Sequence, residues 1–168
     1  VTGPVPETLY ATPFGRARIV APGNDATIVA ISVMAREALQ ARDYLERDLG
    51  WTVEVIDPVS LSPLDLDTIE ASVRRTRNLV VVDCAWTMCG AGSEIVAAMA
   101  ERITDLDLRV RRLGFAPTVC PTTRPLEDLF YPTGRTIASE VFSLLSGKPS
   151  GAWVPLAMPS TSEFKGPF

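Results

Sequence analysis

Apolar residues gather in short runs along this chain, and a clear one lies near its middle. Leu79 to Val82 are four consecutive aliphatic residues, three of them β-branched valines, which predicts a short strand buried on both faces. A glycine-bearing turn follows, and the small residues of 95–100 predict a helix. We expect Ser93 or a neighbour to cap this helix, with Glu94 in the first turn, where a negative charge suits the helix dipole. This unit predicts the centre of an α/β sheet.

Similar runs on either side predict further strands and helices. Gly50 is a suitable end for the first helix, and the arginines between 108 and 113 favour an exposed sheet edge. A tight turn at 22–25 separates the first two strands, so we expect these two to pair antiparallel. The expected strands are 16–21, 27–33, 51–56, 79–82 and 108–113, and the expected helices are 34–49, 67–77, about 93–104 and 135–145.

Strands that alternate with helices four times predict a three-layer α/β/α sandwich. The organisation we expect is an incoming linker at 1–15, the α/β domain at 16–145 and an extended Gly/Pro/Ser-rich tail at 146–168. Within the domain, residues 114–134 contain four prolines and predict an ordered but irregular excursion. The tail is either disordered or strapped onto a neighbour, with Trp153, Val154 and Leu156 as candidate anchors.

The composition narrows the classes of function. The 168 residues make one domain, and the net charge of −4 without a Lys/Arg stripe argues against nucleic acid as a partner. No apolar run reaches the roughly 18 residues of a membrane span, and no export signal precedes the domain, so we expect a cytoplasmic protein without a membrane partner. The three cysteines have no recurring spacing, which favours free thiols in a reducing compartment.

The sequence contains no histidine. This absence removes the usual general base at neutral pH, the commonest metal ligand and any Ser-His or Cys-His nucleophile pair. If the chain belongs to an enzyme, we therefore expect its reacting groups to lie elsewhere, and we assign no catalytic residue and no metal ligand.

One candidate binding site is the turn that contains Gly90, Ala91, Gly92 and Ser93. Backbone amides at a helix N-terminus attract anions, so this turn is a candidate phosphate cradle or interface. Its spacing matches neither the dinucleotide fingerprint nor the P-loop. The alternative is that the glycines let the strand and the helix approach closely.

Other polar residues have two interpretations each. Four carboxylates lie near predicted strand ends or helix starts, where they either line a ligand site or form caps and turns. Three arginines near 74–77 form either an anion patch or a complement to a helix C-terminus. Cys84 and Cys89 are a candidate redox pair without the CxxC spacing. The carboxylates are Asp57, Asp65, Asp67 and Asp83, and the arginines are Arg74, Arg75 and Arg77.

A series of segments, taken together and in order, is distinctive. The segments are VPETLYATPFGRARIV (5–20), GNDATIVA (23–30), VEVID (53–57), LSPLD (61–65), TIEASVRR (68–75), LVVV (79–82), GAGSEI (90–95) and PLE (125–127). They resemble the C-terminal domain of the transketolase family, in particular that of the β subunit of thiamine-diphosphate-dependent 2-oxoacid dehydrogenases of the pyruvate, branched-chain and acetoin kind. The likeness covers about Val5 to Leu145.

The resemblance implies a five-stranded mixed sheet whose first strand is antiparallel. It also implies that thiamine diphosphate and Mg²⁺ of the complete enzyme are held by other domains, so this domain binds no cofactor and is inactive alone. Its implied partners are a homodimer mate, the α subunit and, in relatives, a lipoyl acyltransferase component. The run CAWTMC (84–89) and the tail depart from the family's usual pattern.

Two other interpretations stay open. One alternative to the favoured 2-oxoacid dehydrogenase is the equivalent domain of a transketolase or deoxyxylulose-phosphate synthase that acts on sugar phosphates. A third possibility, from a different class, is a free-standing regulatory module that binds anions through residues 90–93 and the arginines.

Overall fold

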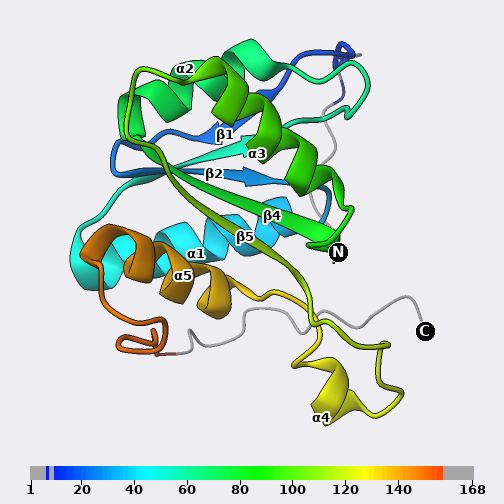
Figure 1. Ribbon diagram of the computed structural model, residues 1–168. Helices are drawn as coiled ribbons and strands as arrows, with labels where there is room; N and C mark the ends of the chain where they lie inside the picture. The colour runs from blue at the N-terminus through cyan, green and yellow to red at the C-terminus, as the bar shows by residue number, and fades with distance from the viewer. Residues whose placement is uncertain (1–6, 8–9, 157–168) are drawn as a thin grey trace.

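A computed structural model of the chain describes Glu7 and residues 10–156. The predicted α/β/α sandwich is confirmed, with helices on both faces of one five-stranded sheet (Figure 1). The strands are β1 (Arg18–Ala21), β2 (Ala26–Ala30), β3 (Val53–Asp57), β4 (Asn78–Trp86) and β5 (Arg109–Phe115). The helices are α1 (Met34–Leu49), α2 (Leu66–Thr76), α3 (Ala91–Arg102), α4 (Arg124–Glu127) and α5 (Gly134–Ser146).

The strand order is β1-β3-β2-β4-β5, and β1 is the antiparallel member. The expectation that the first two strands pair was wrong, because β1 pairs with β3 while β2 lies between β3 and β4. The turn after β1 crosses the start of β3. There the amides of Asn24 and Asp25 both donate to the Thr52 carbonyl, at 3.0 and 2.9 Å. A Cβ on Gly23 would lie 2.1 Å from the Val53 carbonyl carbon, so glycine permits this crossing.

Two apolar clusters hold the three layers together. On one face of the sheet, α1 and α5 pack with Ile28 and Val80, and on the other face α2 and α3 pack with Val29 and Val81 (Figure 1). Because consecutive residues of β2 and β4 point to opposite faces, both faces are apolar along these central strands. The predicted burial of the 79–82 run on both faces is therefore confirmed.

The helix ends follow from local chemistry. Gly50 adopts φ of 69° and ends α1 as predicted. Asp65 caps α2 by accepting the amide of Thr68. Helix α5 begins with a reciprocal capping box between Thr133 and Thr136. The prediction for α3 was wrong in one detail: its N-cap is Gly90, which has no side chain to cap the helix, and not Ser93.

Strand β5 forms the predicted exposed edge, and its arginines at 109, 111 and 112 are exposed. The chain then leaves the sheet as an excursion of residues 116–133 and returns at the start of α5 (Figure 1). The excursion contains the short helix α4, which the prolines of this segment did not suggest; Pro125 is tolerated because it lies in the first turn.

Part of the C-terminal tail folds back onto α5. The ring of Trp153 packs against Phe142 with centroids 5.4 Å apart, and the Trp153 carbonyl accepts the Ser139 hydroxyl at 3.2 Å. Of the three candidate anchors, Trp153 packs on the domain, whereas Val154 and Leu156 are exposed. The rest of the tail, 157–168, lies outside the described residues, as do 1–6, 8 and 9 of the expected linker.

Within the described part of the chain, no helix combines the length and the apolar character that crossing a membrane requires.

Candidate functional site

The turn predicted as an anion cradle lies between β4 and α3, and its polar groups bind to one another. The amide of Gly92 donates to the carboxylate of Asp83 at 3.2 Å, and the amide of Ser93 donates to the Gly90 carbonyl at 2.9 Å. The Ser93 hydroxyl turns back and donates to the Thr87 carbonyl at 2.8 Å. Ser93 thus secures the turn from inside the first turn of α3 instead of capping the helix.

Asp83 fills the position that an external anion would take at the start of α3. Asp83 is 6% exposed, and the cavity beside it measures about 10 Å³, which is close to the smallest space that holds one water. A phosphate there would have to displace the Asp83 carboxylate. The glycines also allow close packing: a Cβ on Gly90 would lie 2.4 Å from the Trp86 carbonyl oxygen, and one on Gly92 would lie 3.2 Å from a Val81 methyl.

An arginine from the edge strand braces the same turn. Arg112 on β5 donates to the Thr87 carbonyl at 2.9 Å and also to the Ser93 hydroxyl. Its guanidinium therefore ties β5 to the turn, and part of its hydrogen-bonding capacity is already used by the chain itself.

The four carboxylates singled out in the sequence are not brought together. Asp57 pairs with Arg18 at 3.2 Å, and Asp67 pairs with Arg102 at 2.8 Å, so these two form surface ion pairs. Asp83 closes the α3 start, and Asp65 caps α2. Among the described residues, no group of three or more Asp, Glu, Cys or His side chains could hold a metal ion.

Asp65 has a perturbed pKa. Burial by itself would raise the pKa of this carboxyl, but hydrogen bonds from the Ala17 amide at 2.9 Å, and from the Thr68 hydroxyl and amide, outweigh it and lower the pKa below its ordinary value. The same carboxylate therefore caps α2 and ties the start of the domain to it.

Two of the three arginines at the end of α2 are engaged in ion pairs. Arg74 contacts Glu70 and Asp105, both at 2.8 Å, and the hydrogen bond from Arg74 lowers the pKa of the Asp105 carboxyl. Arg75 pairs with the buried Glu54 at 2.8 Å. Arg77 adopts the left-handed conformation that ends the helix. Arg74 and Arg75 therefore link α2 to neighbouring elements. The candidate redox cysteines, Cys84 and Cys89, are both free thiols.

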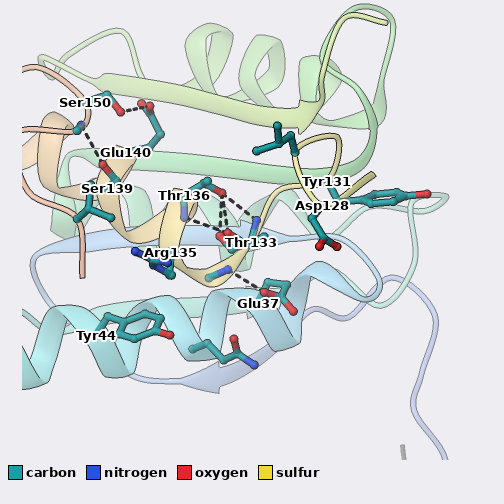
Figure 2. A pocket seen from close by; sticks show the side chains of 15 residues that line it. Glu37, Tyr44, Asp128, Tyr131, Thr133, Arg135, Thr136, Ser139, Glu140 and Ser150 are labelled. Carbon is teal, nitrogen blue, oxygen red and sulfur yellow. Dashed lines mark hydrogen bonds between the residues drawn. The ribbon is translucent and has the colours of Figure 1, made fainter. Parts of the chain in front are cut away.

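A larger cleft, of about 710 Å³, lies between α1, the start of α5 and the folded-back tail (Figure 2). Glu37 from α1 reaches across and accepts the amide of Gly134, at 2.7 Å, at the first turn of α5. On the tail side, Arg135 donates to the Pro155 carbonyl at 3.1 Å, and Glu140 accepts the Ser150 hydroxyl. The lining carries three carboxylates, the third being Asp128, against one guanidinium.

The cleft's chemistry suits binding better than bond-breaking. Carboxylates and hydroxyls predominate in it, the one serine hydroxyl that contacts a carboxylate, Ser150 with Glu140, is an exposed surface pair, and the excess of negative charge disfavours phosphate esters. Sequence reasoning missed this cleft because it is assembled from three distant segments. The one local signal was the spacing of Thr133 and Thr136, which forms the capping box seen in Figure 2.

Comparisons with known proteins agree with the architecture. The family model described as transketolase, C-terminal domain, matches residues 15–137. The acetoin:2,6-dichlorophenolindophenol oxidoreductase subunit beta of Bacillus subtilis (strain 168) is 38% identical over 149 residues, which are 88% of this chain and 43% of that protein. The pyruvate dehydrogenase E1 component subunit beta of Staphylococcus epidermidis is 36% identical over 142 residues, 84% of this chain and 43% of that protein.

A solved structure shares the fold as well. The split gene transketolase, in an inactive β4 tetramer, superimposes with a TM-score of 0.72 at 28% identity and covers 84% of this chain and 47% of that one. The chain thus spans less than half the length of the relatives it matches. Because the family model and these relatives all cover most of the chain, it belongs to the transketolase C-terminal domain family.

Proposed function

We propose that the chain is the C-terminal assembly domain of the β subunit of a thiamine-diphosphate-dependent 2-oxoacid dehydrogenase, and that it joins subunits without carrying catalytic groups. The observation that carries this proposal is the 36–38% identity to the β subunits of an acetoin oxidoreductase and a pyruvate dehydrogenase, over most of this chain but less than half of theirs. The rest of such a subunit, together with its partner subunit, would supply the reaction.

The side chains of this domain do not fit thiamine diphosphate and Mg²⁺. A diphosphate–magnesium group needs convergent oxygen ligands and free backbone amides. The described residues contain no metal-ligating cluster, and Asp83 occupies the start of α3. We therefore place the cofactor of the complete enzyme on other domains and derive no step through it.

The partners we propose follow from the same relatives. The split gene transketolase structure is a β4 tetramer, which supports a second copy of this chain as one partner. The relatives named as β subunits support the α subunit of the same enzyme as the other. A lipoyl acyltransferase component is a further candidate. The three free thiols suit a reducing compartment, and we propose the cytoplasm.

A domain exchange tests the proposal. This chain would replace the corresponding C-terminal segment of the B. subtilis acetoin oxidoreductase β subunit, and the chimera would be produced with the other subunit of that enzyme. We expect the chimera to copurify with that subunit and to restore acetoin-dependent reduction of 2,6-dichlorophenolindophenol. A β subunit truncated before the exchanged segment should do neither.

Two results would contradict the proposal. One is a folded chimera, judged by circular dichroism, that fails to copurify. The other is turnover of a 2-oxoacid by this chain alone when it is supplied with thiamine diphosphate and Mg²⁺.

The split gene transketolase supports a second candidate, the equivalent domain of an enzyme acting on sugar phosphates. The same exchange into that transketolase distinguishes the two. Activity rescued in the transketolase chimera but not in the acetoin oxidoreductase chimera would favour the second candidate.

A further inference from the structure

Another cleft lies at the far end of α5 from the cleft described above, and the charges that line it are positive. It measures about 490 Å³ and lies between the first residues of β5 and the end of α5, which are neighbours in the fold (Figure 1). Arg109 and Arg111 line it from the strand, and Lys148 lines it from the loop after the helix. Ser143 adds a hydroxyl, and among the described residues no carboxylate lines this cleft. Three cations thus converge on a chain whose net charge is −4.

The geometry of the strand sets the spacing of the two guanidinium groups. Arg109 and Arg111 are two positions apart on β5, so their side chains leave the same face of the sheet from Cα atoms about 7 Å apart. Their contacts show that this face is the one that α5 covers: Arg109 donates to the Leu144 carbonyl at 3.0 Å, and Arg111 lies 3.9 Å from the Glu140 carboxylate. A phosphate group fits between two guanidinium groups at this spacing, because its oxygens accept hydrogen bonds from several sides.

The end of α5 accounts for one of these cations and not for the other two. A helix C-terminus attracts positive charge, and Arg109 serves this role at the Leu144 carbonyl. Arg111 donates instead to the preceding carbonyl of its own strand, at 3.1 Å, and its distance from Glu140 exceeds that of a hydrogen bond. Within the described residues, the ammonium group of Lys148 has neither an ion pair nor a hydrogen bond. Arg111 and Lys148 therefore have donors to spare.

The two clefts beside α5 differ in the sign of their charge. The cleft at the start of the helix carries three carboxylates against one guanidinium, whereas the cleft at its end carries two guanidinium groups and an ammonium group. An anion is therefore disfavoured at the start of α5 and favoured at its end.

We propose that the cleft at the end of α5 binds a phosphate group, either as inorganic phosphate or as the phosphate of a small ester. Arg111 and Lys148 bind the phosphate oxygens from opposite sides, Arg109 adds a second guanidinium while it holds the helix end, and the Ser143 hydroxyl donates to a further oxygen. Charged donors make short, strong hydrogen bonds to phosphate, and the volume of the cleft accommodates a small ester. This site goes beyond the assembly role and does not depend on it.

Isothermal titration calorimetry of the full chain with inorganic phosphate, at an ionic strength held constant with chloride, tests the site. We expect the wild type to bind phosphate at millimolar concentration, and Arg111→Gln and Lys148→Gln should each weaken binding about tenfold. Arg18→Gln is the matched control, because it removes an exposed arginine that pairs with Asp57 on β3, at the opposite edge of the sheet. It should leave phosphate binding unchanged. All three variants should keep the wild-type circular dichroism spectrum, since these side chains are exposed.

A titration with glycerol phosphate distinguishes the two sources of the phosphate group. Tighter binding of glycerol phosphate than of inorganic phosphate would support an ester as the ligand, and the reverse order would support the free anion. A wild-type chain that shows neither heat of binding nor a higher melting temperature with either probe would overturn the proposal. So would phosphate binding that Arg111→Gln and Lys148→Gln both leave intact, because the phosphate would then lie elsewhere on the chain.

Discussion

Helices α3 and α5 begin in similar ways but in different surroundings. Each start follows a loop and uses a carboxylate from elsewhere in the chain: Asp83 accepts the amide of Gly92 at α3, and Glu37 accepts that of Gly134 at α5. At α3 the carboxylate is buried beside a cavity of about 10 Å³. At α5 the carboxylate borders a cleft of about 710 Å³.

This difference shows that a helix start can resemble a binding motif and still be unable to bind a ligand. The α3 start has the glycines and amides of an anion site, but its own carboxylate and tight packing leave no room for a ligand. The α5 start has less conspicuous residues, and although Gly134 is itself buried, the adjoining cleft lets solvent or a ligand approach the Glu37 carboxylate. A buried, satisfied helix start stabilises the fold, whereas an open one is available for recognition.

Substituting the glycine at each helix start, Gly90 at α3 and Gly134 at α5, should show the largest difference between the two starts. In Gly90→Ala the new Cβ would meet the Trp86 carbonyl oxygen at 2.4 Å, in a turn pinned by hydrogen bonds on both sides. We expect a loss of about 3 kcal/mol in the free energy of unfolding. In Gly134→Ala the nearest atom is Cβ of Gln40 at 2.8 Å, and the adjoining cleft gives α1 and α5 room to separate. We expect that loss to be about 1 kcal/mol.

Urea unfolding followed by circular dichroism measures both losses. Gly92→Ala is the control, because the nearest atom to its Cβ would be a side-chain methyl of Val81 at 3.2 Å and alanine favours a helix by about 1 kcal/mol. That variant should be nearly neutral. Equal losses for Gly90→Ala and Gly134→Ala would show that the two helix starts are equally constrained, contrary to the comparison.

Much of the fold was predictable because the apolar runs of β2 and β4 and the stripe of α1 have unambiguous periods. The neighbour of β1 was not, because it depends on how closely the backbone at Gly23 passes the start of β3. No local pattern encodes that approach. The excursion was recognised as irregular, but its aromatic cluster joins residues on different elements and became visible only in three dimensions.

The candidate site divides in the same way. The sequence singled out both Asp83 and Gly92, but it could not show that the first satisfies the second, because nine positions separate them. Glu37 and Gly134 are 97 positions apart, so the contact that defines the larger cleft had no local signal at all. The residue types indicated which groups could bind a ligand. Only the tertiary contacts showed which of those groups are already hydrogen-bonded within the chain.

Removing the carboxylate at each helix start, Asp83 at α3 or Glu37 at α5, should also distinguish the two starts, with smaller losses in the free energy of unfolding. Asp83→Ala leaves the amide of Gly92 buried without a partner, which should lower the free energy of unfolding by about 2 kcal/mol. Glu37→Ala leaves the amide of Gly134 beside an open cleft where water replaces the carboxylate, so the expected loss is about 0.5 kcal/mol. Chemical denaturation measures both losses.

Asp83→Asn is the matched variant, since it keeps an acceptor of the same shape, and it should recover most of the loss. Inorganic phosphate should raise the melting temperature of Asp83→Ala more than that of the wild type, because the vacated helix start attracts an anion. If phosphate instead stabilises the wild type as strongly, the Asp83 carboxylate does not block the α3 start.

A third helix start, at α2, should show the smallest effect, which is a change in how the free energy of unfolding depends on pH. Hydrogen bonds lower the pKa of Asp65 below its unfolded value, so its stabilisation is fully present above about pH 4 and is lost as the pH falls through the folded pKa. Asp65→Asn keeps a capping oxygen but cannot titrate. Its free energy of unfolding should therefore fall less between pH 5 and pH 3 than that of the wild type, by about 1 kcal/mol.

Asp67→Asn, which removes an exposed ion pair with Arg102, should keep the wild-type pH dependence. Identical pH profiles for Asp65→Asn and the wild type would mean that this helix start, like that of α5, is open enough for water to replace the charge.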